Sequence, residues 1–394
     1  MGQTLVFLSG KRTCFGAFGG NLKDVSPTDL ATATSKAALE QAGVFPQQVD
    51  HVVFGNVLAS SADSIYIPRH VGLRLGIPES IPALGINRLC GTGFQVIIEA
   101  YQQMIAGDTD VALVGGVENM SMAPYVLRDV RWGTKMGHEQ AYDAMTECLF
   151  DTYVQTPMAI TAENLAEKYK ISRHDADDFA MRSQELYREA LQAGHFLEEI
   201  TPYEIVSRRG AVKTFVHDEH PKSDTTPQIL EKLRPVFKKD GVVTAGNASG
   251  IVDGASAMIV ATEARASVEN WVALGRLVDY GIVGCDPKFM GIGPAPAIRE
   301  VLRRARMKLE QIDLIEINEA FAPQVIAVER ELDLPVDILN VNGGAIAIGH
   351  PLAATGTRII MHLLYELRRR KKRYGIGSAC IGGGQGIALI VEAF

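Results

Sequence analysis

The chain has 394 residues, of which 47% are hydrophobic and 22% charged, and its formal net charge is −7. These values are close to globular averages, which excludes a mainly disordered or collagen-like chain. The acidic balance argues against a nucleic-acid-binding protein, because such proteins are usually basic. The five cysteines form no Cys-x-x-Cys pair, so a reducing compartment is expected rather than a disulfide framework or a structural zinc site.

We recognise no targeting signal at either end of the sequence. No apolar run reaches the roughly 18 residues that a membrane-spanning helix needs. The N-terminus leads into an apolar strand-like run at 5–8 without the features of a secretory signal, and the C-terminus is not a peroxisomal tail. We therefore expect a cytoplasmic protein, with the mitochondrial matrix not excluded.

In chain order, the first clear element is a helix that begins at Pro27. Ser26 is its expected N-cap, Asp29 lies in its first turn, and Gly43 follows its last turn. Strand-like and helical runs then alternate, which predicts an α/β protein with a mostly parallel sheet covered by helices.

The chain repeats itself at an offset of 263 residues (301 minus 38). Segment 38–58 resembles 301–321, Thr92-Gly93 matches Thr355-Gly356, and the run 111–117 matches 374–380. Agreement in order and register predicts two copies of one α/β unit. We expect an N-terminal half at 1–120, to which 251–272 returns, and a C-terminal half at 273–394. The remaining 121–250 is expected to form an inserted loop domain, with a helix near 162–193 and a methionine-rich apolar wall or ordinary core.

Cys90 is the first candidate for chemistry. It lies in Asn-Arg-Leu-Cys-Gly-Thr-Gly-Phe (87–94), just before a run that continues as a helix to Ala106. Free N–H groups and the helix dipole at such a position favour a thiolate. The alternative is a buried, inert cysteine.

His350 lies between Gly349 and Pro351, in a turn before a helix expected to start near Ala354. In the repeat it falls within three residues of the position equivalent to Cys90. Related turns meet at the same edge of their sheets, so a Cys–His pair with His350 as general base is predicted. A structural histidine is the alternative.

Cys380 ends a strand-like run and opens a glycine-rich turn at 382–384, whose bare N–H groups could hold an oxyanion. The turn contains neither a dinucleotide fingerprint nor a P-loop. Asn318, in Asn-Glu-Ala-Phe (318–321), also follows a strand and is expected at the same edge.

These segments, together with 114–122 and 246–254, resemble the thiolases, the acetyl-CoA C-acyltransferases and C-acetyltransferases. The blocks occur in family order over nearly the whole chain. The resemblance is strongest to mitochondrial-type 3-ketoacyl-CoA thiolases and acetoacetyl-CoA thiolases. It implies the thiolase fold, a layered α-β-α-β-α sandwich of two duplicated halves with an inserted loop domain. It also implies thiolysis of 3-ketoacyl-CoA, as in β-oxidation, or Claisen condensation of acetyl-CoA.

The resemblance implies a role for each candidate. Cys90 would be the acylated nucleophile, and His350 would take its proton and bind the thioester oxygen with a water held by Asn318. Cys380 would move a proton at the α-carbon, and the N–H groups of Cys90 and Gly382 would form a second oxyanion hole. Ping-pong kinetics are expected.

Coenzyme A and acyl-CoA would be substrates, with no cofactor and no metal. The resemblance implies that they are bound by residues of the inserted segment and its neighbours: Ser249, Met158, Lys222, Phe237, Ala245, Ala248, Ala320 and Phe321. Pro157 stands where many short-chain members have histidine, and Ala353-Ala354 departs from the usual pattern after His350-Pro351, so the acyl length stays open. A homotetramer is favoured over a dimer, because 120–145 resembles a tetramerisation loop.

Six basic residues at 368–373 are first interpreted as a solvated helix terminus. A nucleic-acid or lipid role is the alternative, although no nucleic acid or membrane is expected as a partner. Competing functions are a ketoacyl-synthase-like condensing enzyme, a non-catalytic thiolase-like lipid carrier, and a thiol redox or metal protein. Cys14, Cys148 and Cys285 have no assigned role.

Overall fold

The computed structural model describes residues 3–206 and 210–394. Residues 1–2 of the expected N-terminal half and 207–209 of the expected insertion lie outside the described residues. Within the described ranges, no helix is both long enough and apolar enough to cross a membrane.

The central sheet contains one order of four strands twice, with one further edge strand in the first half. In one half the order is β4 (Ala83–Ile86), β3 (His51–Gly55), β5 (Val111–Glu118), β12 (Val252–Thr262) and β1 (Leu5–Arg12). In the other it is β14 (Leu314–Ile317), β15 (Tyr374–Ile381), β16 (Gln385–Ala393) and β13 (Gly275–Gly284). The offset of 263 carries the bounds of β5 onto those of β15 and the start of β3 onto the start of β14. The halves join where Val6 and Phe7 pair with Arg276 and Gly275.

The prediction of a mostly parallel sheet was wrong. Only β3 with β4, β3 with β5, and β14 with β15 pair in parallel among the named strands. The remaining pairs of the two strand orders are antiparallel. The glycine-rich turn at 382–384 gives the reason, because so short a connection between β15 and β16 can only join antiparallel strands.

Helices complete five layers. The middle layer holds α3 (Thr92–Ala106) and α12 (Leu352–Arg369), which pack in one core with strands of both halves. One outer face carries α1 (Pro27–Ala42), α2 (Ile67–Arg74) and α8 (Glu263–Glu269). The other carries α9 (Pro294–Ala305) and α10 (Ala322–Leu332). This is the expected α-β-α-β-α sandwich.

The two middle helices touch at equivalent positions of the repeat. A Cβ added to Gly93 would lie 2.6 Å from the Ala353 carbonyl oxygen and from the Gly356 nitrogen. A Cβ added to Gly356 would lie 2.2 Å from the Phe94 nitrogen. Backbones can approach this closely only where no Cβ intervenes. Since α3 follows Cys90 and α12 follows His350, this contact sets the spacing of the two candidates.

The segment between the halves contains two long helices rather than the single one expected near 162–193. They are α5 (Met158–Tyr169) and α6 (Arg173–Gln192). Lys170 adopts left-handed φ of 53° and ends the first, and the Ser172 side chain caps the second in a box with Asp175. The caps at Lys170 and Ser172 thus divide the expected helix in two, although the helical sequence pattern continues across them.

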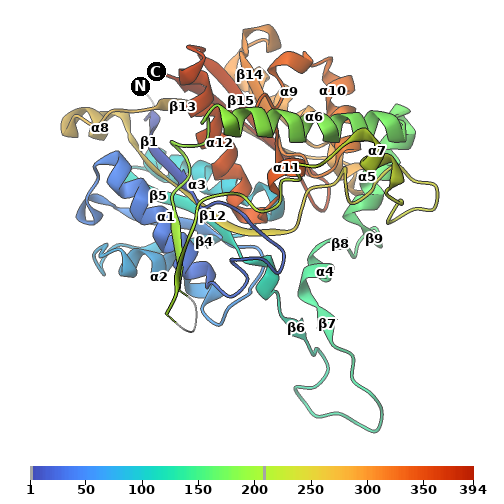
Figure 1. Cartoon of the computed structure of the whole chain (residues 1–394). Helices are drawn as coiled ribbons and strands as arrows, with labels where there is room; N and C mark the ends of the chain where they lie inside the picture. Colours follow the sequence, from blue (N-terminus) through green and yellow to red (C-terminus); the bar gives the residue numbers. More distant parts are fainter. Residues whose placement is uncertain (1–2, 207–209) are drawn as a thin grey trace.

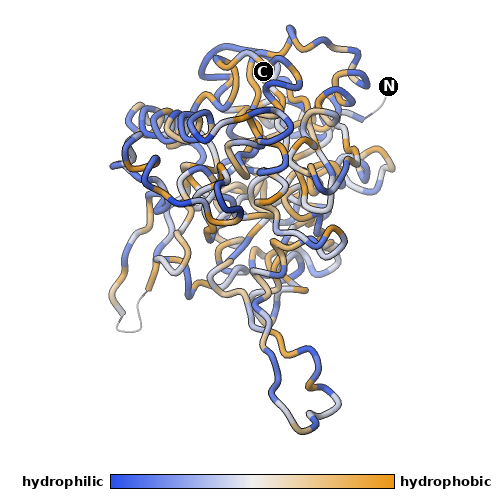
Figure 2. Tube along the Cα trace, turned by 90° about the vertical axis from the view of Figure 1, so that its right-hand side faces the viewer, coloured by the Kyte–Doolittle hydropathy of each residue, from blue (hydrophilic) through white to orange (hydrophobic). Residues whose placement is uncertain are grey.

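Shorter elements form the rest of the segment. They are β6 (Tyr125–Val126), β7 (Tyr142–Asp143), α4 (Ala144–Cys148), β8 (Phe150–Asp151), β9 (Thr156–Pro157), β10 (Tyr203–Val206), β11 (Val212–Phe215) and α7 (Pro227–Lys232). The β6–β7 hairpin projects from the lower end of the molecule, as Figures 1 and 2 both show. Outside this segment, β2 (Gly16–Ala17) pairs with β12, and α11 (Ala345–Ile348) precedes His350.

Candidate active site

Cys90 lies in the 3₁₀ turn Leu89–Gly91 that leads into α3. Leu89 has a φ of 46°, a strained value for a branched residue that presents Cys90 at a sharp turn. The Thr92 hydroxyl stabilises the turn by accepting a hydrogen bond from the Arg88 N–H at 2.8 Å. A strained turn held by a local side chain is a common feature of catalytic positions.

Burial outweighs the helix terminus in setting the state of this thiol. Burial raises the pKa of Cys90 to about 11, although hydrogen bonds from the backbone N–H groups of Gly382 and of Cys90 itself act to lower it. The backbone N–H groups at the helix start therefore favour a thiolate, as expected, but burial outweighs them in the resting site. The same contacts direct both N–H groups that were expected to form an oxyanion hole toward the sulfur.

His350 follows Gly349, whose φ of 92° belongs to the region that favours glycine. Its ring has a polar contact on each side: Nδ1 lies 2.6 Å from the Thr355 hydroxyl, and Nε2 lies 3.3 Å from Asn318 Nδ2. The Thr355 hydroxyl donates to the Pro351 carbonyl at 3.2 Å, so it accepts from Nδ1–H. The Asn318 amide then donates to an unprotonated Nε2. The network assigns the tautomer whose Nε2 is free to take a proton.

The pKa of His350 is lowered to about 3, first by burial and then by the nearby Arg358 cation. The imidazole is therefore neutral at physiological pH. Asn318 Oδ1 is buried and receives no hydrogen bond from the residues that the structure describes. A buried acceptor of this kind normally binds water or a ligand group.

Cys380 lies at the other side of the same site, near the end of β15. It is fully buried with Met290 and Ala320, and Met158 and Phe321 pack against this cluster. Burial, and then the neighbouring thiols of Cys90 and Cys285, raise the pKa of Cys380 well above its usual value. A thiol held protonated in this way can donate a proton to a developing carbanion.

The turn after Cys380 packs against the turn that holds Cys90. A Cβ at Gly382 would meet the Leu89 side chain at 3.2 Å and the Met158 sulfur at 3.4 Å. Gly383 and Gly384 have φ values of 82° and 85°, so the tight turn requires glycine at both. Cys90, Cys380 and Gly382 thus come together from segments that lie nearly 300 positions apart.

A cavity of about 380 Å³ opens beside His350. Six expected residues line it: Met158, Phe237, Ala248, Ser249, Phe321 and His350. Pro157, noted in the sequence for its bearing on acyl length, lines it too. Sequence reasoning did not assign the rest of the wall, which comprises Met120, Met145, Thr146, Leu149, Phe150, Ala159, Gly250, Ile251 and Leu352. Three of the wall's side chains are methionines, so the methionine-rich pattern was the one signal that could have indicated it.

Three expected contact residues are not part of that wall. Ala320 lies beside it, where its carbonyl accepts from the Ser249 N–H at 3.0 Å. Ala245 is exposed. Lys222 lines a separate cavity of about 190 Å³.

Glu118 is a buried acid that the sequence did not single out. Its carboxylate accepts hydrogen bonds from the N–H groups of Val57 and Leu58, which stabilises the loop after β3. Burial raises its pKa to about 8. Cys148 packs with Cys90 against one small apolar cluster, and all five cysteines are free. No group of three or more potential metal ligands occurs among the described residues.

Comparison with known proteins identifies relatives over the whole chain. Residues 5–264 match the family model of the thiolase N-terminal domain, and 271–393 match that of the thiolase C-terminal domain. Mitochondrial 3-ketoacyl-CoA thiolase of Bos taurus is 54% identical over 98% of this chain and 97% of its own. Acetyl-CoA acetyltransferase of Pseudomonas aeruginosa is 44% identical over 98% of each chain. The crystal structure of human mitochondrial 3-ketoacyl-CoA thiolase in complex with CoA has a TM-score of 0.97 and 52% identity, covering 100% of this chain and 98% of that one.

Proposed function

The chain belongs to the thiolase family, and on that premise we propose how its own residues carry out the reaction. It is a thiolase, which transfers acyl groups between 3-ketoacyl-CoA and CoA in the direction of thiolysis or of condensation. This assignment stands over a ketoacyl synthase or a non-catalytic lipid carrier. We propose the roles of the individual residues, the preferred acyl length, the assembly and the compartment.

The nucleophile is Cys90, and its base is His350. Because the thiol pKa is near 11 and the imidazole pKa near 3, the resting pair is neutral. The proton moves from Sγ to Nε2 as the sulfur attacks the 3-keto carbon of the substrate. The carbon–carbon bond then breaks, which leaves an acyl thioester on Cys90 and the α-carbanion of acetyl-CoA. The unprotonated Nε2, which can exchange its hydrogen bond from Asn318 for the thiol proton, supports this proposal most directly.

Cys380 gives its proton to that carbanion and takes a proton from the acetyl group in the reverse direction. Its fully buried, protonated thiol suits the transfer. In the second half-reaction the CoA thiol gives its proton to the Cys380 thiolate, which restores that thiol, and its sulfur attacks the acyl-enzyme. Cys90 then leaves as the thiol, because its proton returns from His350. Two half-reactions through one acyl-enzyme require ping-pong kinetics.

Each half-reaction develops negative charge on an oxygen, so two sets of donors are needed. We assign one to protonated His350 together with a water on the unpaired Asn318 Oδ1. We assign the other to the backbone N–H groups of Cys90 and Gly382. Donors fixed by turns and by burial do not have to reorganise as the charge forms.

CoA is proposed to enter along the cavity wall formed by Phe237, Ala248 and Ser249, as a substrate and not as a resident cofactor. Ala245 and Lys222 would contact its outer parts. Beyond His350 the wall continues through Met145 and Leu149, an apolar lining that fits an alkyl chain longer than acetyl. We therefore propose 3-ketoacyl-CoA thiolysis in fatty-acid β-oxidation as the main activity, with acetoacetyl-CoA as a poorer substrate.

The chain-length profile tests the substrate assignment. CoA-dependent loss of 3-ketoacyl-CoA is measured from acetoacetyl-CoA to long-chain esters, with Cys90→Ala as the control for background cleavage. We expect kcat/KM to rise beyond four carbons. Activity confined to acetoacetyl-CoA would overturn the substrate assignment but keep the thiolase, and activity of Cys90→Ala would overturn the nucleophile.

A homotetramer is the proposed assembly. The projecting loop between β6 and β7 carries Trp132 at 92% exposure and a fully exposed Met136, side chains that a second copy would bury. Light scattering of the purified protein measures the mass directly, and a dimer would refute the tetramer. The compartment remains our expectation of the cytoplasm, with the mitochondrial matrix as the alternative suggested by the relatives' names.

A further inference from the structure

The basic run, residues 368–373, lies far from the catalytic cavity. It comprises the end of α12 and the turn before β15, and all six side chains are exposed. Helix α12 begins beside His350 and has 18 residues, so its end lies about 27 Å from that site along the helix axis. The reaction makes no use of this surface.

The charges of the basic run are only partly compensated. Two carboxylates each serve two guanidinium groups: Glu366 pairs with Arg369 and Arg370, and Glu392 pairs with Arg373 and Arg276. Lys372 lies 3.6 Å from Asp313. In the described part of the chain, Arg368 and Lys371 have no ion pair. A chain of net charge −7 therefore presents a local excess of positive charge at one end.

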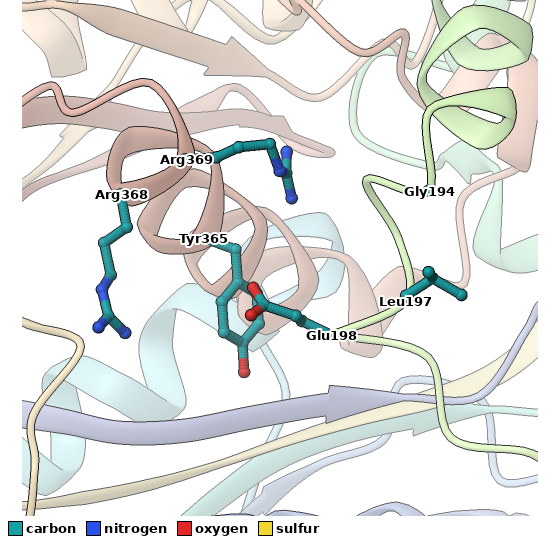
Figure 3. A pocket seen from close by; sticks show the side chains of 6 residues that line it. All are labelled: Gly194, Leu197, Glu198, Tyr365, Arg368 and Arg369. Atoms are coloured by element: carbon teal, nitrogen blue, oxygen red, sulfur yellow. The ribbon is translucent and has the colours of Figure 1, made fainter.

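A cavity of about 480 Å³ adjoins this surface, between the last turn of α12 and the turn at 194–198 (Figure 3). Arg368 and Arg369 leave α12 on either side of Tyr365. Glu198 is the acidic residue in the wall of the cavity. Lys11 lies close to the cavity, because the Lys11 Nζ donates to the Glu198 carbonyl at 2.6 Å. Arg369 is already paired with Glu366 and donates to the His195 carbonyl, whereas Arg368 has no ion pair in the described part of the chain. Arg368, with Lys11 nearby, gives the cavity the positive charge that suits a phosphate group.

Exposed apolar side chains flank the same surface. Leu197, in the cavity wall, is 80% exposed. Phe394, at 56% exposure, lies beside the run because the N–H of Ala393 donates to the Arg373 carbonyl. Val272, which is 79% exposed, lies close to Phe394. The Phe394 N–H donates to the carbonyl of Leu274, two residues after Val272. Basic residues with scattered large apolar ones are typical of surfaces that bind the membrane interface.

We propose that this end of the molecule docks on the surface of an anionic phospholipid bilayer. The basic run attracts the headgroups, the cavity between Arg368 and Arg369 accepts a lipid phosphate, and Leu197 and Phe394 enter the interface. This departs from the sequence expectation of no membrane partner and takes up the lipid role that was its alternative.

The proposed orientation leaves the active site accessible. Strand β15 starts at Tyr374 beside the basic run and ends next to Cys380, so the catalytic edge of the sheet faces away from the lipid. In Figure 1 both termini lie at the upper end and the β6–β7 hairpin projects from the lower end. A docked enzyme would exchange CoA esters freely with the aqueous phase.

Vesicle flotation of the full-length protein tests the proposal. Phosphatidylcholine vesicles are compared with vesicles containing roughly one third phosphatidylserine, at low and high salt. We expect binding only to the anionic vesicles, and release by salt. Arg368→Gln with Lys371→Gln removes two charges that have no ion pair, and should weaken partitioning roughly thirtyfold, at about fivefold per charge.

The matched control is Lys23→Gln with Lys213→Gln, two exposed lysines that lie away from the basic run and outside the loop of the proposed tetramer contact. It makes the same change in net charge and should bind like the unmodified protein. Leu197→Ser with Phe394→Ser should weaken binding without altering net charge. All variants should retain thiolysis, which shows that they are folded.

Absence of vesicle binding, or equal loss in the control pair, would overturn the proposal. Equally tight binding to soluble polyglutamate, unaffected by Leu197→Ser with Phe394→Ser, would assign the surface to an acidic protein instead. Neither result depends on the catalytic assignments, because thiolysis is measured separately.

Discussion

The contact between α3 and α12 leads to a specific prediction for Gly93→Ala. The new Cβ would lie 2.6 Å from two backbone atoms of α12, about 0.8 Å short of an ordinary contact of 3.4 Å. Because both obstructing atoms are backbone, no side chain can rotate away, and the two helices must separate. Cys90 precedes one helix and His350 the other, so the movement changes the distance across which the proton is transferred.

The magnitudes follow from that displacement. Overpacking of this kind costs about 1–3 kcal/mol of the free energy of unfolding. A misplacement of about 1 Å between reacting groups costs on the order of a hundredfold in rate. We therefore expect Gly93→Ala to fold with a lower melting temperature and to lose about a hundredfold in kcat, with a smaller change in KM.

The assay is CoA-dependent thiolysis, read together with thermal unfolding. Gly85→Ala is the matched control, because its new Cβ would come no closer than 3.6 Å to its nearest neighbour. A Gly93→Ala protein that melts lower but turns over normally would refute the claim that this contact positions the pair. Normal stability and normal activity would refute the packing argument as well.

Four further predictions concern the site directly. Cys90→Ala should form no acyl-enzyme by mass spectrometry, and full turnover by this variant would contradict the mechanism. Cys380→Ala should still become acylated but should fail at condensation, so normal condensation would remove its assigned role. Alkylation of Cys90 should accelerate about tenfold per pH unit from pH 7 toward its pKa near 11, because only the thiolate reacts; a flat profile would indicate a resting ion pair. Thr355→Val removes the acceptor for His350 Nδ1–H and should lower kcat at least tenfold with little change in KM, whereas Thr355→Ser should restore it; equal rates for both variants would dismiss the tautomer argument.

The ion-pair network of Glu199, Arg12 and His362 shows how burial and charge have opposite effects on the pKa of a carboxyl group elsewhere in the chain. Glu199 is fully buried, yet the neighbouring His362 and Arg12 lower its pKa to about 2. A depressed carboxyl pKa contributes stability above the unfolded value near 4.5, and that stability is lost as pH falls toward 2. This network ties β1, α12 and the inserted segment together.

Much of the fold could be predicted because its signals are local. Ser26 and Gly43 delimit α1 as expected, since caps act within a few residues of chain. The offset of 263 carries β5 onto β15, because duplication preserves the order of elements. The candidates Cys90, His350 and Cys380 were visible because each lies in or next to a glycine-containing turn.

Other features depended on contacts between distant segments. The direction of strand pairing was mispredicted, because periodicity does not report which strands become neighbours. The long helix expected near 162–193 was interrupted at Lys170, where capping by Ser172 prevailed. Apart from its methionines, most of the cavity wall, including Leu149 and Phe150, carried no pattern of its own.

The amino-acid sequence by itself determined the duplicated α/β organisation, the turns that hold the candidate residues and the resemblance to thiolases. Only the tertiary structure decided the state of the groups. Cys90 stands at a helix start, which favours a thiolate, but burial by the packing around it raises its pKa. Burial also keeps His350 neutral, and the tautomer of this histidine follows from partners at 318 and 355. Protonation depends on solvation and on neighbours far away in the chain, and both exist only once the two halves have packed together.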